Sequence, residues 1–257
     1  MGPNGWPHNM RRLISLWIIA ICLLQATFAQ SQGGAFTLET KLSELAPADQ
    51  LTAYSAIYQD NSQMSWELFV PETYDPANPP GVLVYISPAK TGTAPRSWHR
   101  VLEDENLIFI SANGAGNKAP THQRLANAGL ALRAVNRRYK TDPERRYLSG
   151  FSGGARVSSI AVETIPNIFH GAIFMGGAFN WHGDTNTMAE TLKGRSYVFI
   201  TGRDDHARPE VVKAYRQYKD IETAHVNLID DARHGHDLPN ARTLKKALSF
   251  LSLEDGD

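Results

Sequence analysis

The sequence predicts an α/β fold, with a doubly wound, mostly parallel sheet and helices on both faces of that sheet. Two patterns predict it. Short, nearly continuous apolar runs recur along the chain, and such runs are typical of strands buried on both faces. Between them, apolar residues repeat every three or four positions, which is the spacing of amphipathic helices. This alternation of strand and helix predicts a parallel sheet with crossover helices.

The predicted strands follow one another along most of the chain. The apolar runs that predict parallel strands are residues 82–86, 107–110, 146–149, 172–175, 197–200 and 225–229. The segments before Pro71, which include residues 66–70, are expected to add antiparallel strands at an edge of the sheet.

Helices are predicted between these runs. Apolar residues recur at helical spacing within residues 125–139 and 244–251, and Pro209 is expected in the first turn of a further helix. Only about 20 residues separate Met175 from Ser196, so no large lid is expected there. In doubly wound sheets, ligands bind beyond the carboxyl ends of the strands. We therefore expect the functional residues in the loops that follow the apolar runs.

Composition argues against several classes of protein. The chain has 257 residues with 26 basic and 26 acidic side chains, so its net charge gives no reason to expect nucleic acid as a partner. Hydrophobic residues make up 42% and charged residues 20%, which argues against disorder. A chain of this length buries about 70% of its unfolded surface, so it needs neither a disulfide nor a metal to hold its core.

The first thirty residues have the pattern of a secretory signal peptide. Arg11 and Arg12 precede an apolar run over residues 13–24, and the small residues around Ala29 suit a cleavage site. The apolar run is shorter than the ~20 residues that span a bilayer. The pattern therefore predicts export rather than a membrane anchor.

This pattern sets the expected domain boundaries. Residues 1–29 are the expected signal peptide, and residues 30–257 are the expected single α/β domain. Cleavage would remove Cys22, the only cysteine of the sequence. The mature protein is expected in the periplasm or the medium, as a monomer without stable membrane association.

A Gly-x-Ser-x-Gly motif, residues 150–154, lies between a predicted strand and a run of small residues that suits the start of a helix. A serine at the tip of such a turn exposes its hydroxyl group, and the flanking glycines let strand and helix approach without Cβ clashes. A plain glycine-rich turn is the alternative. The strand and helix on either side favour Ser152 as a nucleophile.

A pair of acidic residues follows the apolar run 197–200. A carboxylate at this place can orient an imidazole and stabilise its protonated form. Asp204 is better explained as a turn or helix-capping residue before Pro209. Asp205 is therefore the expected catalytic acid.

Two histidines follow the last apolar run and precede the last predicted helix. A histidine in this loop can reach back over the edge of the sheet to the serine. His236, which follows a glycine, is the expected general base, and His234 is the alternative.

The three groups occur in the order Ser, Asp, His, which is the chain order of α/β-hydrolases. Such a triad also needs donors for the oxyanion that forms during acyl transfer. The N–H of Gly153 is one natural donor. The second is expected from the loop after residues 82–86, where Pro88 has no N–H. Ala89 is therefore expected, and Lys90 is the alternative.

Over residues 66–251 the sequence resembles secreted α/β-hydrolase esterases related to polyhydroxybutyrate depolymerases and feruloyl esterases. The residues that carry the resemblance are 147–154, 199–202 with Asp205 and Arg208, 235–239, and 113–117. The resemblance implies Ser152 as nucleophile, Asp205 as acid and His236 as base. It also implies a small or oligomeric carboxylic ester as substrate.

Three aromatic side chains fall in loops at the expected ends of strands. Phe151, Phe179 and Trp181 could form an aromatic wall for the acyl or aryl group of a substrate. The alternative is that these three side chains pack within their own loops.

Two other functions stay open. A metal-dependent hydrolase could draw its ligands from Asp204, Asp205, His206, His234 and His236. That hypothesis does not explain why Ser152 lies in a Gly-x-Ser-x-Gly motif. A catalytically silent hydrolase-like fold that serves for binding is the second. The sequence favours a serine esterase that uses neither a metal nor a cofactor.

Overall fold

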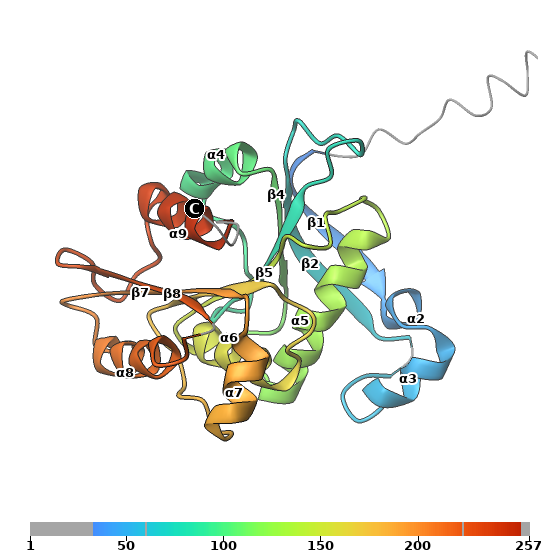
Figure 1. Ribbon diagram of the computed structural model, residues 1–257. Helices are drawn as coiled ribbons and strands as arrows, with labels where there is room; N and C mark the ends of the chain where they lie inside the picture. Colours follow the sequence, from blue (N-terminus) through green and yellow to red (C-terminus); the bar gives the residue numbers. More distant parts are fainter. Residues whose placement is uncertain (1–32, 60, 223, 253–257) are drawn as a thin grey trace, which may run out of the picture. The chain divides into compact units, whose positions relative to one another are not determined.

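An eight-stranded sheet forms the centre of the described part of the chain, which is residues 33–59, 61–222 and 224–252 of a computed structural model (Figure 1). The predicted signal peptide, residues 1–29, lies outside the described residues. The strands in chain order are β1 (Gly34–Lys41), β2 (Gln63–Val70), β3 (Gly81–Ile86), β4 (Leu107–Ala112), β5 (Arg146–Phe151), β6 (Gly171–Met175), β7 (Ser196–Gly202) and β8 (His225–Asp231).

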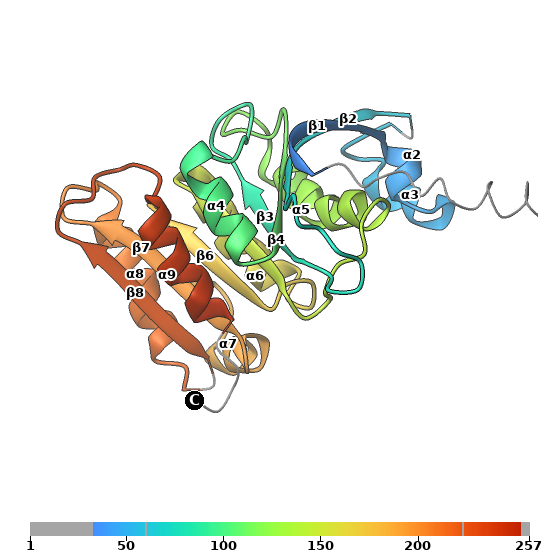
Figure 2. The same ribbon diagram turned by 90° about the horizontal axis from the view of Figure 1, so that it is seen from above.

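The order of strands in the sheet is β1-β2-β4-β3-β5-β6-β7-β8. β2 is antiparallel to both β1 and β4, and every pair from β4 onward to β8 is parallel. Figure 2 shows β7 and β8 at one end of the sheet and β1 and β2 at the other. The predicted fold class, a mostly parallel sheet with an antiparallel edge, is confirmed.

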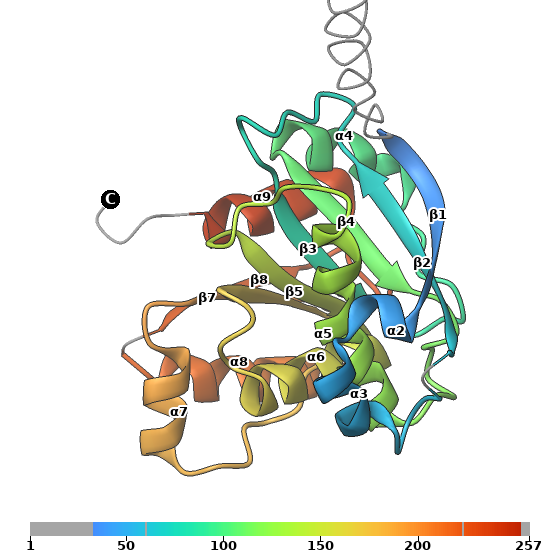
Figure 3. The same cartoon turned by 90° about the vertical axis from the view of Figure 1, so that its right-hand side faces the viewer.

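Helices cover both faces of this sheet (Figure 3). One face is covered by α4 (Arg96–Asp104) and α9 (Ala241–Leu251). The other face is covered by α5 (Thr121–Asn136), α6 (Gly153–Thr164) and α8 (Arg208–Lys219). The short helices are α2 (Leu42–Leu45), α3 (Ala48–Tyr54) and α7 (Thr185–Leu192).

The segment between β6 and β7 contains α7 alone, which agrees with the expected lack of a large lid. Within the described ranges, no helix combines the length and the apolar character that a bilayer crossing requires.

The strands contribute side chains to two apolar layers, one under each set of helices. In β3, Leu83 and Tyr85 pack in the layer that contains Trp98 of α4, whereas Val84 packs in the layer that contains Ala128 of α5. Successive side chains of a strand point to opposite faces. Because both faces are covered, every residue of β3, β6 and β7 is buried. This explains why these strands are continuous apolar runs in the sequence.

The parallel strands direct their carboxyl ends to one edge of the sheet. Ser152 follows β5 directly, Asp205 follows β7, and His236 lies in the loop between β8 and α9. The fold therefore brings these three loops to the edge where ligands bind in doubly wound sheets.

Candidate active site

Ser152 occupies a sharp turn between β5 and α6. Its backbone angles are φ 53° and ψ −120°, in a region that non-glycine residues rarely adopt. The turn is held on both sides, because the N–H of Ser152 donates to the carbonyl oxygen of Met175 at 2.8 Å and its own carbonyl accepts from the N–H of Arg156 at 3.2 Å. A strained strand-to-helix turn of this kind is the geometry expected for the predicted nucleophile, and we call residues 150–154 the nucleophile turn.

The flanking glycines are required by close approach of backbone. A Cβ atom on Gly154 would overlap with the carbonyl oxygen of Ile86, and one on Gly150 would collide with the backbone of Gly154. Both glycines therefore allow β5, α6 and the end of β3 to pack as tightly as the turn demands.

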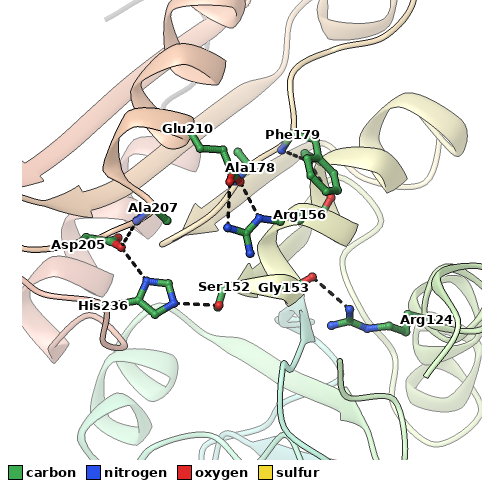
Figure 4. A network of polar contacts seen from close by, with 11 residues as sticks. Arg124, Ser152, Gly153, Arg156, Ala178, Phe179, Asp205, Ala207, Glu210 and His236 are labelled. Atoms are coloured by element: carbon green, nitrogen blue, oxygen red, sulfur yellow. Dashed lines mark hydrogen bonds and ion pairs between the residues drawn. The ribbon is translucent and has the colours of Figure 1, made fainter. Parts of the chain in front are cut away.

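Three side chains form a continuous chain of hydrogen bonds (Figure 4). Nδ1 of His236 lies 2.7 Å from Oδ1 of Asp205, and Nε2 of His236 lies 2.9 Å from Oγ of Ser152. With Asp205 ionised, Nδ1–H donates to the carboxylate, and Nε2 accepts from the serine hydroxyl. The structure thus brings together the three residues that the sequence nominated as nucleophile, acid and base.

Asp205 is 4% exposed and each of its oxygens accepts a further hydrogen bond. Oδ1 accepts from the N–H of Ala207 at 2.8 Å, and Oδ2 accepts from the hydroxyl of Thr201 at 3.0 Å. Burial by itself raises the pKa of Asp205, but the hydrogen bonds from Ala207, His236 and Thr201 outweigh burial and hold the pKa below its ordinary value. The carboxylate is therefore kept charged beside the imidazole.

The two alternative residues lie elsewhere. The side chain of Asp204 is exposed. His234 belongs to the turn after β8, where its N–H donates to the carbonyl oxygen of Asp231 at 3.1 Å. Hydrogen bonds to Ser152 and Asp205 are described for His236, and none is described for His234.

The expected oxyanion donors differ in their availability. The N–H of Gly153 is at the first position of α6, where a helix leaves its N–H groups without partners in the helix. The N–H of Ala89 already donates to the hydroxyl oxygen of Ser87 at 3.0 Å. It would have to release that partner to bind an oxyanion. The N–H of Lys90, the alternative, donates to no acceptor among the described hydrogen bonds.

Arg124 is a residue of this site that the sequence analysis missed. It is 5% exposed and donates to three backbone carbonyl oxygens: Ala115 at 2.9 Å, Ser87 at 2.9 Å and Gly153 at 3.2 Å. These carbonyls belong to the segments that follow β4, β3 and β5. Burial lowers the pKa of the Arg124 guanidinium. One buried cation therefore joins three segments around Ser152.

Asn117 also reaches the nucleophile turn. Its side-chain amide lies against Gly153, where a Cβ atom would overlap with Oδ1 of Asn117. Its backbone N–H donates to the carbonyl oxygen of Pro88 at 2.9 Å. The glycine-rich segment 113–117 therefore borders both the nucleophile turn and the expected oxyanion loop, residues 87–92.

A second network fixes the loop after β6 beside the nucleophile turn (Figure 4). The guanidinium of Arg156 donates to both carboxylate oxygens of Glu210, at 2.8 and 2.9 Å. Glu210 also accepts from the N–H of Ala178 at 3.0 Å, and the N–H of Phe179 donates to Oγ of Ser159 at 2.9 Å. These contacts join the starts of α6 and α8 to the loop that carries Phe179.

The three aromatic residues have different environments. The ring of Phe151 lies 5.0 Å from the ring of His236, between centroids, so it adjoins the site. Phe179 is 41% exposed and available to a ligand. Trp181 is buried in the apolar layer, and its backbone N–H and carbonyl both bond to the side chain of Gln217, so its described contacts hold the loop in place.

Some of the residues considered as metal ligands lie together. Ligand atoms of Asp205, His206 and His236 all fall within 4.8 Å of one another, and the rings of His206 and His236 are 4.0 Å apart between centroids. Asp204 and His234 do not belong to this group. Both oxygens of Asp205 are already engaged by hydrogen bonds, which suits an acid that orients an imidazole.

Comparison with known proteins identifies the fold. No protein-family model and no curated protein matches the chain. The fluorophosphonate-binding serine hydrolase F of Staphylococcus aureus superposes with a TM-score of 0.64 at 11% identity, over 85% of this chain and 98% of that one. A ferulic acid esterase superposes with a TM-score of 0.63 at 13% identity, over 85% and 98% of the two chains.

A third similar structure is longer. A dipeptidyl aminopeptidase IV-like protein from Bacteroides ovatus superposes with a TM-score of 0.60 at 14% identity over 86% of this chain, which spans 36% of the length of that protein. Together with the strand order and the nucleophile turn, these similarities show that the chain has the α/β-hydrolase fold.

Proposed function

We propose that this protein is a serine hydrolase that cleaves carboxylic esters through an acyl-enzyme. One observation carries the proposal: two hydrogen bonds run from Asp205 through His236 to Ser152, at the nucleophile turn of an α/β-hydrolase fold. The fold is shared with a serine hydrolase and with an esterase, which supports the same class of reaction.

The proposed reaction has two steps, and His236 accepts a proton in each of them. Oγ of Ser152 attacks the carbonyl carbon of the ester while Nε2 of His236 takes the hydroxyl proton. The ester C–O bond then breaks, and the imidazolium returns the proton to the leaving alcohol. In the second step, His236 takes a proton from water as the water attacks the acyl-serine. The bond to Ser152 then breaks, the imidazolium returns the proton to Oγ of Ser152, and the carboxylic acid is released. Asp205 stabilises the imidazolium in both steps.

The oxyanion that forms in each step needs preorganised donors. We assign the N–H of Gly153 as the first donor. The second donor in the proposal is the N–H of Lys90 or, after release of the Ser87 hydroxyl, the N–H of Ala89. These backbone N–H groups act without a metal or a cofactor.

The proposed substrates are small or oligomeric esters, among them the feruloyl and hydroxyalkanoate esters that the family resemblance implies. Export to the periplasm or the medium, and action as a monomer without stable membrane association, complete the proposal. The predicted signal peptide, residues 1–29, supports export.

A fluorophosphonate probe tests the proposed nucleophile, because it reacts covalently with activated serines. We expect labelling of wild type and of the control Ser97→Ala, whose serine is exposed on α4, and no labelling of Ser152→Ala. Hydrolysis of a panel of p-nitrophenyl esters should fall by about 10⁴-fold or more in Ser152→Ala and survive EDTA. Absence of labelling in wild type would instead favour a binding protein, and loss of activity with EDTA would favour a metal-dependent hydrolase.

A further inference from the structure

A cavity of about 660 Å³ lies beside the expected oxyanion loop. Its walls come from Pro88 and Lys90 after β3, Asn117 and Lys118 after β4, and Pro120 at the start of α5. A volume of this size is typical of sites for small molecules. The residues of the triad do not line it, so ester cleavage alone gives this cavity no role.

One wall of the cavity touches the nucleophile turn. The side-chain amide of Asn117 lies against Gly153, the residue that follows Ser152. The hydrogen bond from the backbone N–H of Asn117 to Pro88 keeps this wall against the expected oxyanion loop. Asn117 therefore lines the cavity and also contacts the residue that follows Ser152.

The position of the cavity decides which half of an ester it can receive. In the sheet, β3 and β4 lie on one side of β5, whereas β7 and β8 lie on the other. His236, which follows β8, must face the leaving alcohol because it returns a proton to it. The acyl chain is bonded to the same carbon as the alcohol and leaves it in another direction, and the cavity formed by the loops after β3 and β4 lies on the side away from His236.

The charge of the cavity is positive. Among the described residues that line it, Lys90 and Lys118 are the charged ones, and none is acidic. Both lysines are exposed, and neither takes part in an ion pair within the described part of the chain. The first turn of α5, which borders the cavity at Pro120 and Gln123, has no acidic residue either. An anion entering here meets two cations and no opposing charge.

The rest of the lining is suited to a short carbon chain. Pro88, Ala119 and Pro120 present apolar surface, and Gly114 and Gly116 contribute no side chain. An apolar wall with a few convergent polar groups is the usual character of a small-molecule site. The cavity thus combines a surface for methylene groups with two ammonium groups.

We propose that this cavity binds a free carboxylate at the far end of the acyl chain. The inference rests on the proposed esterase function and adds preferred substrates to it: monoesters of dicarboxylic acids and oligomeric esters whose acyl end carries a carboxylate. Feruloyl and hydroxyalkanoate esters carry no carboxylate on the acyl side and gain nothing from this site. The ammonium groups of Lys90 and Lys118 pair with that carboxylate, while Pro88 and Pro120 contact the chain between it and the ester.

Matched pairs of p-nitrophenyl esters test this specificity. Each hemiester of a dicarboxylic acid (succinate, glutarate and adipate) is compared with the neutral ester of the same chain length. The readout is kcat/KM for the hemiester divided by kcat/KM for the neutral ester. We expect this ratio to fall about tenfold in Lys90→Gln/Lys118→Gln and further in Lys118→Glu. Added salt should also lower the ratio in wild type, because it screens exposed charges.

Lys193→Gln is the matched control. Lys193 is an exposed lysine that precedes β7 and so lies at the opposite edge of the sheet from the nucleophile. The ratio of kcat/KM values for the hemiester and the neutral ester in Lys193→Gln should equal that of wild type. A ratio that is the same in wild type, in the double variant and in Lys118→Glu, with the neutral esters hydrolysed, would overturn the carboxylate site and leave the esterase proposal intact.

A binding measurement separates the two proposals. Calorimetric titration of monomethyl glutarate into Ser152→Ala reports the carboxylate site without any chemistry. We expect binding that is weakened about tenfold when Lys90→Gln/Lys118→Gln is added to Ser152→Ala, and unchanged when Lys193→Gln is added. Equal affinity in all three proteins would contradict the inference even if no ester were hydrolysed.

Discussion

The two halves of the site are held together by different kinds of contact. In the triad half (Ser152, Asp205 and His236), side chains bond to side chains at 2.7 and 2.9 Å. In the oxyanion half (residues 87–92 and 113–118), one buried guanidinium, that of Arg124, bonds to backbone carbonyls instead. The triad half therefore depends on the identity of three side chains, whereas the oxyanion half depends on where the backbone lies.

This difference predicts two kinds of defect. A substitution in the triad half removes a reacting or orienting group but leaves the surrounding loops in place. A substitution of Arg124 leaves every reacting group in place but frees three carbonyls, and so loosens the segments after β3 and β4 relative to the nucleophile turn.

The largest effect is expected for the acid of the triad. Asp205→Asn keeps the shape of the side chain but favours the wrong tautomer of His236, and it stabilises the imidazolium less. We expect kcat to fall about 10⁴-fold, by analogy with the same exchange in the chymotrypsin triad. Initial rates with a p-nitrophenyl ester measure it.

Asp204→Asn provides the control for this prediction, because Asp204 is the exposed neighbour of Asp205. Its kcat should stay within about twofold of wild type. Equal losses in the two variants would show that the hydrogen bonds of Asp205 do not set the rate.

A smaller effect is expected for Arg124, which acts as a positioning residue. Arg124→Met should lower kcat about 100-fold, the scale of losing one oxyanion donor, with a smaller change in KM. The affinity for a trifluoromethyl ketone, which forms a tetrahedral adduct with the serine, should fall in parallel. Arg124→Lys keeps the charge but loses the forked geometry, so we expect only partial recovery.

Arg133→Met separates positioning from general stability. Arg133 lies on the same helix, α5, and donates to the carbonyl oxygen of Leu45 and to the side chain of Gln50, both remote from the nucleophile. Its melting temperature should fall while kcat and ketone affinity stay unchanged. If Arg133→Met and Arg124→Met lost kcat in proportion to their melting temperatures, Arg124 would be a structural residue only.

The smallest effect concerns acid stability in the triad half. Burial raises the pKa of Asp205, yet hydrogen bonds from Ala207, His236 and Thr201 leave it below its ordinary value. A depressed pKa contributes stability that is complete above the ordinary aspartate value of about 3.9 and is lost as pH falls through the lowered pKa. Urea unfolding should therefore show wild type more stable than Asp205→Asn near neutral pH.

The stability difference between these two proteins should shrink as the pH falls below about 4. A difference between wild type and Asp205→Asn that stays constant down to the lowest pH would mean that the carboxylate gains nothing from its partners on folding.

The fold was predictable because the two faces of the sheet are both covered. Burial on both faces makes β3, β6 and β7 continuous apolar runs, and these are visible in one sequence. The antiparallel edge was expected from the segments before Pro71, but only residues 66–70 were named. The bounds of β1 were not predicted, because its alternating burial gives a weaker apolar signal.

The triad half was also accessible to sequence reasoning. Ser152 is bracketed by glycines, and Asp205 and His236 follow apolar runs, so residue type and order together predicted that the three would meet. The sequence favoured Asp205 over Asp204, and the turn after β7 gives the physical reason, because it buries Asp205 and leaves Asp204 exposed.

The oxyanion half could not be predicted in the same way, because it depends on backbone groups. The expectation for Ala89 excluded Pro88 correctly as a donor but could not foresee that the Ser87 hydroxyl engages the N–H of Ala89. Arg124 gave one signal that was overlooked: it shares a helical face with the buried Ala128 and Ala131, and an arginine on such a face needs internal acceptors.

The left-handed backbone at residue 152 has a consequence for protein engineering. Glycine adopts these angles at no steric cost, whereas serine holds them only because the surrounding turn enforces them. A selection for heat tolerance alone would therefore favour replacement of Ser152 by glycine, which relaxes the turn and removes the proposed nucleophile. Libraries built on this scaffold must score resistance to heating and catalytic output together.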